Sequence, residues 1–288
     1  MSTTTDQMKF LSLDELEITL ANARSKNQAI GFVPTMGALH NGHLSIIERA
    51  SKENDFTVVS IFVNPTQFNN PSDLEKYPRT PIEDIQRLQN SGCHIAFLPD
   101  VETIYPEDFN PPKVDLGTLD KVMEGKHRPG HFYGVVTVVY RLFDIVKPTN
   151  AYFGRKDFQQ VAIIKAIKNA LNLPVNVIEC PTLRDEKGLA LSSRNLLLSK
   201  EDIQTAYHIY ETLAYGKSLV NSTAPTKTKE LMINFFSSSK MELEYIEIVD
   251  PVTLVELSNE WVEGATACLV AYCGNVRLID NLELVPYS

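Results

Sequence analysis

The feature that most restricts the fold is an alternation of short apolar runs with amphipathic segments between residues 28 and 180. The runs are rich in β-branched side chains, which is typical of buried strands, whereas the segments between them carry apolar residues at helical spacing. The predicted strands are "QAIGFV" (28–33), "FTVVSIFV" (56–63), "HIAFLP" (94–99), "NAYFG" (150–154) and "VNVIEC" (175–180). The predicted helices are residues 42–54, 80–92, 132–146 and 157–172. This order predicts an α/β fold with a doubly wound parallel sheet, Rossmann-like in class.

Residues 132–146, "FYGVVTVVYRLFDIV", could form a strand by composition alone. Their length and the strand-like run that follows favour a crossover helix. A proline-rich stretch over 99–130 is expected to be a loop.

The pattern changes after about residue 190. Two predicted helices precede three strand-like runs, "LEYIEIVD", "ATACLVAYC" and "VRLIDNLEL". The helices cover about 201–220 and 225–238. We therefore expect two domains, a Rossmann-like domain over 1–190 and a smaller C-terminal α+β domain over 191–288.

Composition limits the classes of partner. With 288 residues and 43% hydrophobic side chains, the chain can bury a substantial core. Its formal net charge of −9 argues against a general binder of phosphate backbones, although a local basic pocket could hold a small anion. No apolar run approaches the roughly 20 residues of a membrane-spanning helix, and "MSTTTDQMKF" lacks the layout of a signal peptide. We expect a cytoplasmic protein that binds neither nucleic acid nor membrane.

The four cysteines lie mostly among apolar neighbours and show no CxxC spacing; they are Cys93, Cys180, Cys268 and Cys273. We interpret them as reduced thiols of a cytoplasmic protein, with a zinc site or a disulfide as the alternative. The "NST" sequon at Asn221 is then a chance match.

The clearest chemical signal is "GFVPTMGALHNGHLSIIERA" (31–50). A predicted strand leads through a glycine-bearing turn to a helix N-terminus, where unpaired backbone N–H groups and the helix dipole favour an anion. Gly37 and Gly42 allow a ligand to approach the backbone closely. His40 and His43 share one face if the turn is helical, so both rings could donate to phosphate oxygens. A capped turn with two solvent-facing histidines is the alternative.

Six motifs resemble those of one known family: "PTMGALHNGHL", "IFVNPTQF", "YPRT", "RPGHFYGVVTVV", "FGRKDFQQ" and "LSSRN". They occur in this order over residues 34–195 and closely resemble the pantoate–β-alanine ligases. The resemblance implies an HxGH nucleotidyltransferase type of fold, Mg²⁺ and a homodimer. It also implies a two-step reaction: ATP adenylates pantoate with loss of pyrophosphate, and the amine of β-alanine then attacks the acyl adenylate to give pantothenate and AMP.

The resemblance assigns ATP binding to three segments of the first domain and its boundary. They contain Met36, Gly37, Ala38, Leu39, His40, Asn41, Gly42 and His43, then Gly154, Arg155, Lys156 and Asp157, and finally Leu183, Leu191, Ser192, Ser193 and Arg194. We expect His43 to be the principal catalytic residue, with His40 and Lys156 as its partners at the phosphates. No covalent nucleophile is needed, because ATP supplies the activation and the enzyme supplies positioning and charge stabilisation.

"GRKD" places Lys156 and Asp157 at a strand–helix junction, in the crevice where open α/β sheets bind ligands. Lys156 could bring its cation to the phosphates, and Asp157 could cap the helix or bond a ribose hydroxyl. An ordinary helix cap beside a solvated lysine is the alternative. Family members often have Glu or Gln where Arg155 stands, so that position is expected to contribute backbone contacts.

"LSSRN" combines the hydroxyls of Ser192 and Ser193 with the guanidinium of Arg194. Because arginine binds oxyanions with a fork of donors and a domain junction can move, these residues suit a mobile phosphate clamp. A serine-rich linker is the alternative. The family's usual aromatic residue after this motif is Leu197 here, which affects only the expected packing.

By resemblance, Gln67 and Gln160 bind pantoate between the apolar side chains of Val138 and Val139, and Gln67 also lies near β-alanine. Neutral amides suit a small polyhydroxy acid because they can both donate and accept hydrogen bonds. Two surface amides are the alternative.

Glu83 and Asp84 form an acidic pair in the helix after "YPRTP". Acids are favoured in the first turn of any helix, so a structural role comes first. A role in holding Mg²⁺ is carried over from the family, since Mg²⁺ usually takes few carboxylates together with phosphate oxygens.

Two other function classes remain open from the sequence. Another HxGH nucleotidyltransferase would keep the nucleotide in its product, whereas the ligase releases AMP. An aminoacyl-tRNA synthetase is disfavoured because this short acidic chain has no evident RNA-binding extension. A nucleotide-sensing or scaffold protein would have a degenerate site, and the joint presence of His40, His43, Lys156 and Arg194 argues against that.

Overall fold

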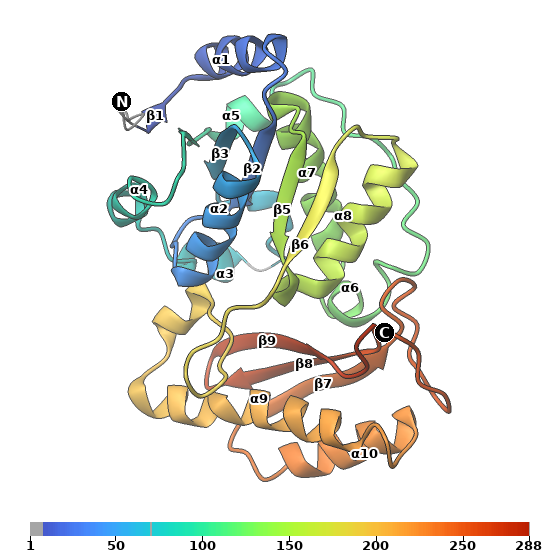
Figure 1. Ribbon diagram of the computed structural model, residues 1–288. Coiled ribbons are helices and arrows are strands. Elements are labelled where there is room, and N and C mark those ends of the chain that lie inside the picture. Colours follow the sequence, from blue (N-terminus) through green and yellow to red (C-terminus); the bar gives the residue numbers. More distant parts are fainter. Residues whose placement is uncertain (1–7, 70, 288) are drawn as a thin grey trace. The chain divides into compact units, whose positions relative to one another are not determined.

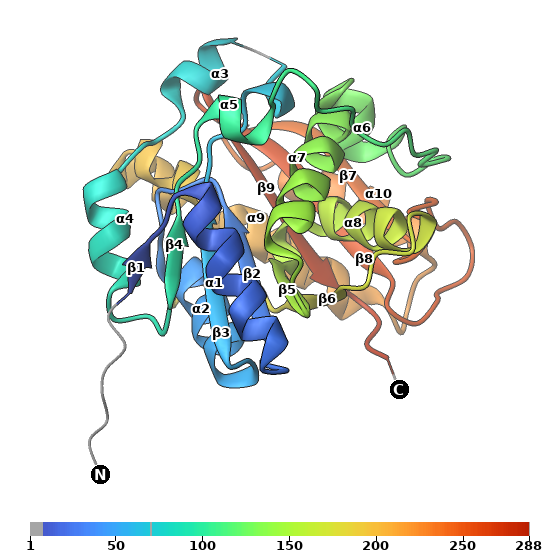
Figure 2. The ribbon, with the colours of Figure 1, turned by 90° about the horizontal axis from the view of Figure 1, so that it is seen from above.

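A six-stranded parallel sheet with the strand order β1-β4-β3-β2-β5-β6 forms the centre of the first part of the chain, as Figure 2 shows. The computed structural model describes residues 8–69 and 71–287. The strands are β1 (Lys9–Phe10), β2 (Ile30–Thr35), β3 (Phe56–Ile61), β4 (Ile95–Phe97), β5 (Asn150–Gly154) and β6 (Asn176–Cys180). The predicted α/β class and doubly wound sheet are confirmed.

Eight α-helices precede α9 among the described residues. They are α1 (Leu13–Ser25), α2 (Asn41–Glu53), α3 (Pro71–Lys76), α4 (Pro81–Leu88), α5 (Val101–Ile104), α6 (Met123–His127), α7 (His131–Val146) and α8 (Phe158–Ala170). The valine-rich segment is thus a helix, as predicted. The stretch over 99–130 is not only a loop, because it contains α5 and α6.

The second part of the chain forms an antiparallel sheet covered by two helices (Figure 1). Its elements are α9 (Lys200–Leu219), α10 (Pro225–Phe236), β7 (Glu242–Val249), β8 (Thr266–Cys273) and β9 (Val276–Glu283). Leu213 of α9, Met232 of α10 and Leu269 of β8 are fully buried in one shared core. This is the predicted α+β arrangement.

The two compact units interleave in the sequence. The first contains the described residues of Met1–Asp115, Gly130–Arg155 and Ile163–Pro181, and the second contains those of Leu116–Pro129, Lys156–Ala162 and Thr182–Ser288. The predicted domain boundary near residue 190 stays a prediction, because a compact unit need not fold on its own. No helix among the described residues is both long and apolar enough to cross a membrane.

A buried ion cluster ties α6 to the antiparallel sheet of the second unit. Arg277 of β9 donates to both carboxylate oxygens of Glu124, at 2.8 and 2.6 Å, and also pairs with Glu244 of β7. The hydroxyl of Tyr245 donates to Glu124 at 2.9 Å. Burial alone would raise the pKa of Glu124, but the hydrogen bonds and charge of Arg277, with the charge of Arg128, outweigh it and lower the pKa to about 2.

This depressed pKa predicts how stability depends on acid. A carboxyl group whose pKa is lower in the folded state stabilises the fold above its ordinary value of 4.5, and that contribution is lost as the pH falls toward about 2. We expect Glu124→Gln to lower stability at neutral pH and to flatten its dependence on pH in this interval, measured by urea unfolding. The matched control is Glu17→Gln, which removes the same charge from an exposed position. An unchanged pH slope in Glu124→Gln would contradict this assignment.

Candidate active site

The sheet reverses its winding between β2 and β5, which are hydrogen-bonded neighbours (Figure 2). The chain leaves β2 into the turn that precedes α2, and it leaves β5 into the 3-10 turn Arg155–Asp157. Open α/β sheets bind ligands at such a switch point, beside the carboxyl ends of the strands. The HxGH turn and the GRKD turn therefore start from the two strands where a ligand site is expected.

Side chains of the protein accept hydrogen bonds from the backbone N–H groups of the turn just before the HxGH motif. Thr35 accepts from the N–H of Gly37 at 3.3 Å, and Asp84 accepts from those of Ala38 and Leu39 at 2.9 and 2.7 Å. Side chains of the protein thus engage these three amides, which precede the helix. Anion binding at the N-terminus of α2 itself stays a prediction.

The two histidine rings cap α2 with their Nδ1 atoms. Nδ1 of His40 accepts from the N–H of Gly42 at 3.1 Å, and Nδ1 of His43 accepts from the N–H of His40 at 3.3 Å. A neutral imidazole that accepts at Nδ1 carries its proton on Nε2. The two rings lie 4.0 Å apart between centroids, so the turn holds two Nε2–H donors side by side. The same two rings can therefore cap the helix through Nδ1 and donate to phosphates through Nε2, so the two interpretations of this motif are compatible.

Asp84 lies in the first turn of α4 and is 2% exposed. Besides the two amides, one of its oxygens accepts from the hydroxyl of Thr80 at 3.1 Å. Glu83 is exposed, and the described residues include no cluster of three or more His, Cys, Asp or Glu side chains suited to a metal ion. Hydrogen-bond donors of the protein thus already contact the Asp84 carboxylate, and the Mg²⁺ role of Glu83 and Asp84 stays a prediction.

Gln67 closes the 3-10 turn Pro65–Gln67 after β3 and is 8% exposed. Its Oε1 accepts from Nδ2 of Asn64 at 3.2 Å, and its Nε2 lies 2.8 Å from the sulfur of Met36. Gln67 is therefore buried beside the HxGH turn and is not a surface amide. Asn64, which the sequence analysis did not single out, is 1% exposed and also accepts from the hydroxyl of Tyr105 at 2.7 Å.

The N-terminal turns of α7 support the position of Gln67. Nδ1 of His131 lies 2.8 Å from the carbonyl oxygen of Gln67, and since a carbonyl only accepts, this nitrogen donates. Gly134 is needed because a Cβ at this position would lie 2.5 Å from the carbonyl oxygen of Thr66. Val138 and Val139 follow on the same helix and are buried. Of the predicted pantoate residues, the first unit thus holds Gln67, Val138 and Val139.

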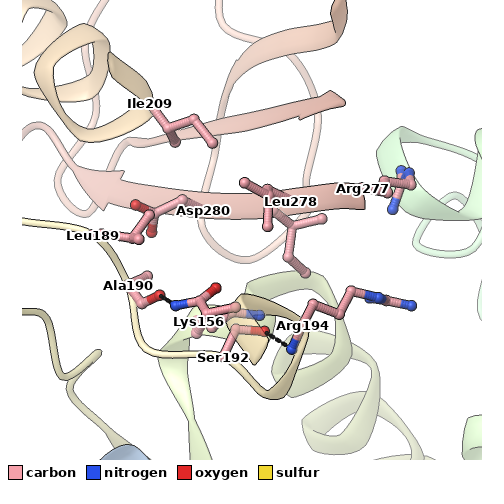
Figure 3. Close-up of a pocket in the computed structure, with 11 residues that line it drawn as sticks. Lys156, Leu189, Ala190, Ser192, Arg194, Ile209, Arg277, Leu278 and Asp280 are labelled. Carbon is pink, nitrogen blue, oxygen red and sulfur yellow. Dashed lines mark hydrogen bonds between the residues drawn. The ribbon is translucent and has the colours of Figure 1, made fainter. Parts of the chain in front are cut away.

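The second unit contains a pocket that includes residues of both remaining predicted segments, as Figure 3 shows. Lys156, Ser192 and Arg194 lie along one side of it, and β9 lies along the other. Its lining comprises Lys156, Leu189, Ala190, Ser192, Arg194, Asn195, Ile209, Arg277, Leu278, Ile279 and Asp280. Lys156 and Arg194, from two separate segments of the chain, thus line one pocket.

Two polar residues of β9 hold the walls of this pocket. Nδ2 of Asn281 donates to the carbonyl of Lys156 at 2.8 Å, which fixes the backbone of that lysine. Asp280 is 5% exposed and accepts from two nitrogens of Arg184, at 2.5 and 2.9 Å. Neither residue carries a motif in the sequence, so only the fold reveals them.

Several predicted residues have local roles. The hydroxyl of Ser192 accepts from the N–H of Arg194 at 3.3 Å and caps the short 3-10 segment that follows, whereas Ser193 is buried. The N–H of Leu191 donates to the carbonyl of Leu183 at 3.0 Å, which closes the hairpin before this segment. Asp157 accepts from Lys156 at 3.3 Å.

Arg155 and the two glutamines of "FQQV" differ in their contacts. Arg155 pairs with Glu179 of β6 at 3.3 Å, so its side chain serves the first unit's own structure. Gln159 is buried, and its amide bonds the backbone of Leu119, Val122 and Glu124. Gln160 is partly exposed and has no hydrogen-bond partner in the part of the chain that the structure describes. The two neighbouring glutamines therefore differ in role. Gln159 holds the backbone around α6, whereas the amide of Gln160 is available to a ligand.

This fold and this turn define a Rossmann-like α/β protein of the HxGH type. The sequence profile of the family described as Pantoate-beta-alanine ligase matches residues 9–283, and the chain belongs to that family. It is therefore an enzyme, a pantoate–β-alanine ligase, and the resemblance noted from six motifs is confirmed. The alternatives of another nucleotidyltransferase and of a non-catalytic scaffold are no longer favoured.

The chain is similar to pantothenate synthetases over nearly its whole length. That of Porphyromonas gingivalis is 47% identical over 281 residues, covering 95% of this chain and 98% of the relative. The crystal structure of pantothenate synthetase from Thermus thermophilus superposes with a TM-score of 0.91 at 41% identity, covering 97% and 100% of the two chains. The ligase from Francisella tularensis, solved in complex with β,γ-ATP and β-alanine, gives a TM-score of 0.80 at 39% identity, covering 96% and 98%.

Proposed function

We propose that this ligase condenses pantoate with β-alanine in two steps at one site. In the first step a carboxylate oxygen of pantoate attacks the α-phosphorus of ATP, the α–β anhydride bond breaks, and pyrophosphate leaves. In the second step the neutral amine of β-alanine attacks the acyl carbon of pantoyl adenylate, loses a proton, and expels AMP. The observation that carries the proposal is that β2 and β5, neighbours at the switch point, lead directly into the HxGH and GRKD turns.

The roles of the residues follow from their donors. His43, the principal catalytic residue, and His40 donate through Nε2–H to the phosphates as charge develops on the leaving pyrophosphate. Lys156 and Arg194 supply cations to the same phosphates. The other ATP contacts are Met36, Gly37, Ala38, Leu39, Asn41, Gly42, Gly154, Arg155, Asp157, Leu183, Leu191, Ser192 and Ser193.

Pantoate lies between two neutral amides and an apolar wall. Gln67 and Gln160 bind its carboxylate and hydroxyls, while Val138 and Val139 contact its dimethyl group. Burial of Gln67 beside Met36 supports this role, because it places the amide next to the turn that binds ATP. β-Alanine binds on the side of Gln67.

Phosphate oxygens of ATP would hold Mg²⁺ at this site. Mg²⁺ keeps several waters and takes few protein ligands when phosphate oxygens are present, so it does not require a preformed carboxylate cage. When bound, the ion neutralises phosphate charge.

The assembly and location complete the proposal. The enzyme is a cytoplasmic homodimer that binds neither nucleic acid nor membrane, and its domains divide near residue 190. The four cysteines are buried free thiols, which supports a reducing compartment. Light scattering would test the dimer, and limited proteolysis would test the domain boundary.

Omitting the amine tests the reaction sequence. With ATP and pantoate alone, we expect pyrophosphate to be released in an amount close to that of enzyme, because the adenylate remains bound. AMP should accumulate catalytically only after β-alanine is added. The measurement is a quench-flow assay of pyrophosphate and nucleotide products. ADP and phosphate as products would indicate an acyl phosphate and contradict the adenylate mechanism.

A further inference from the structure

We propose that Asp84 is a positioning residue for catalysis, which sets the HxGH turn so that the two histidine rings face the substrate. The proposal rests on the proposed function in one respect, namely that His43 is catalytic. Its structural basis is the buried Asp84 carboxylate, which accepts hydrogen bonds from the backbone N–H groups of Ala38 and Leu39.

The turn before the HxGH motif needs an external support. Gly37 and Ala38 have φ values of 81° and 47°, in the left-handed region that a residue other than glycine adopts only when its surroundings impose it. The N–H groups of Ala38 and Leu39 point to separate oxygens of the same carboxylate. Such charge-assisted bonds are stronger than neutral ones. A bidentate contact of this kind therefore determines the direction in which the chain enters His40.

The carboxylate is itself held firmly. It projects from the first turn of α4, whose backbone N–H at Asp84 bonds the carbonyl of Thr80 at 2.8 Å, and the Thr80 hydroxyl donates to one of its oxygens. A Cβ at Gly37 would lie 3.0 Å from the other oxygen, so the turn and the carboxylate are packed in close contact. Asp84 thus links α4 to the turn that precedes α2.

The bonds of the two histidine rings connect the turn to catalysis. Nδ1 of each ring is tied to the backbone of the turn, so the direction of each Nε2–H depends on the backbone conformation from residue 37 to residue 42. Asp84 determines that conformation without touching a substrate. Its loss should therefore reduce the part of the rate that depends on the ring of His43 and leave other parts of the rate unchanged.

The test is a double-mutant cycle between Asp84→Asn and His43→Ala. An asparagine keeps the shape but offers only one acceptor, so in the wild-type background we expect kcat to fall by about 10- to 100-fold, as for loss of a charge-assisted hydrogen bond. In the His43→Ala background Asp84→Asn should reduce kcat by no more than about twofold, since residues that act as a unit are not additive. Full additivity would overturn the proposal. A higher Mg²⁺ concentration for half-maximal rate in Asp84→Asn would also overturn it, because that is the signature of a metal ligand.

Two further variants keep the test independent of folding and of the role of His43. Thr80→Val removes only the hydroxyl bond to Asp84 and should give a smaller loss of the same non-additive kind. Asp100→Asn, which removes the exposed carboxylate that caps α5, is the control and should turn over at the wild-type rate. Hydrogen exchange measures the contact between Asp84 and the turn directly. The amides of Ala38 and Leu39 should exchange faster in Asp84→Asn. Unchanged exchange would contradict the proposal that Asp84 holds the turn. Faster exchange together with full activity of His43→Ala would instead contradict the catalytic role of His43.

Discussion

Replacing His43 by alanine is expected to lower kcat by about 10²- to 10³-fold, the range found when one preorganised donor to developing charge is removed. The Nδ1 atom of His43 accepts from the backbone N–H of His40, so its Nε2–H is the group that we propose to meet the phosphates. ATP affinity should fall much less, because the bond is proposed to strengthen as pyrophosphate leaves. Steady-state kinetics with saturating pantoate and β-alanine measure kcat, and calorimetry without pantoate measures ATP binding.

The ring of His43 also caps α2, and a second variant separates the two roles. His43→Gln places an acceptor at the third helical position, from which a glutamine can reach back to the N–H of His40. We expect His43→Ala to lose about 1 kcal/mol of folding stability through the missing cap, whereas His43→Gln keeps most of it. Both should lose turnover to a similar extent. Wild-type turnover in His43→Gln, or weaker ATP binding as the sole effect of His43→Ala, would remove His43 from the chemistry.

The central strands of the parallel sheet were predictable because they are buried on both faces, whereas the exposed edge strand β1 was not predicted. The residues of β3, "FTVVSI", are nearly all apolar or β-branched, which distinguishes them from the amphipathic helices on either side. Helix α1 was not predicted, although Ser12 and Glu15 form a capping box before its buried Leu16 and Leu20. Its apolar stripe is narrow, and Ile18 on the opposite face is 63% exposed, so the helical period is weak in the sequence.

The candidate site was only partly predictable, because motifs report residue types and not their partners. His40 and His43 were identified from their spacing, but their role as caps depends on which ring atom faces the backbone. Asp84 resembled an ordinary acid in a first helical turn, which the helix dipole favours in any case. Its true partners lie more than 40 residues earlier in the chain, and no local pattern connects them. His131 and Asn281 bond backbone carbonyls, which any residue supplies, so the sequence contains no signal for their partners.

Replacing Gln160 by leucine is expected to weaken pantoate binding by about one to two orders of magnitude, since an unmet buried hydrogen bond costs roughly 1–3 kcal/mol. Folding stability should barely change, because Gln160 has no hydrogen-bond partner among residues 8–69 and 71–287. The adjacent Gln159→Leu is the matched contrast: it removes three bonds to the backbone around α6 and should lower the free energy of unfolding. Calorimetric titration with pantoate and urea unfolding measure the two effects.

Gln67→Leu should combine both kinds of loss. This side chain bonds Asn64 and contacts Met36, so its removal should disturb the HxGH turn as well as the proposed pantoate site. We expect weaker pantoate binding, slower capture of the amine and a measurable loss of stability, whereas ATP binding without pantoate should change little in Gln160→Leu. The two glutamines therefore give different patterns although both are proposed to bind the same acid. If Gln160→Leu lost ATP affinity while pantoate binding survived, the amide would belong to the nucleotide site, and the assignment of both glutamines to pantoate would be wrong.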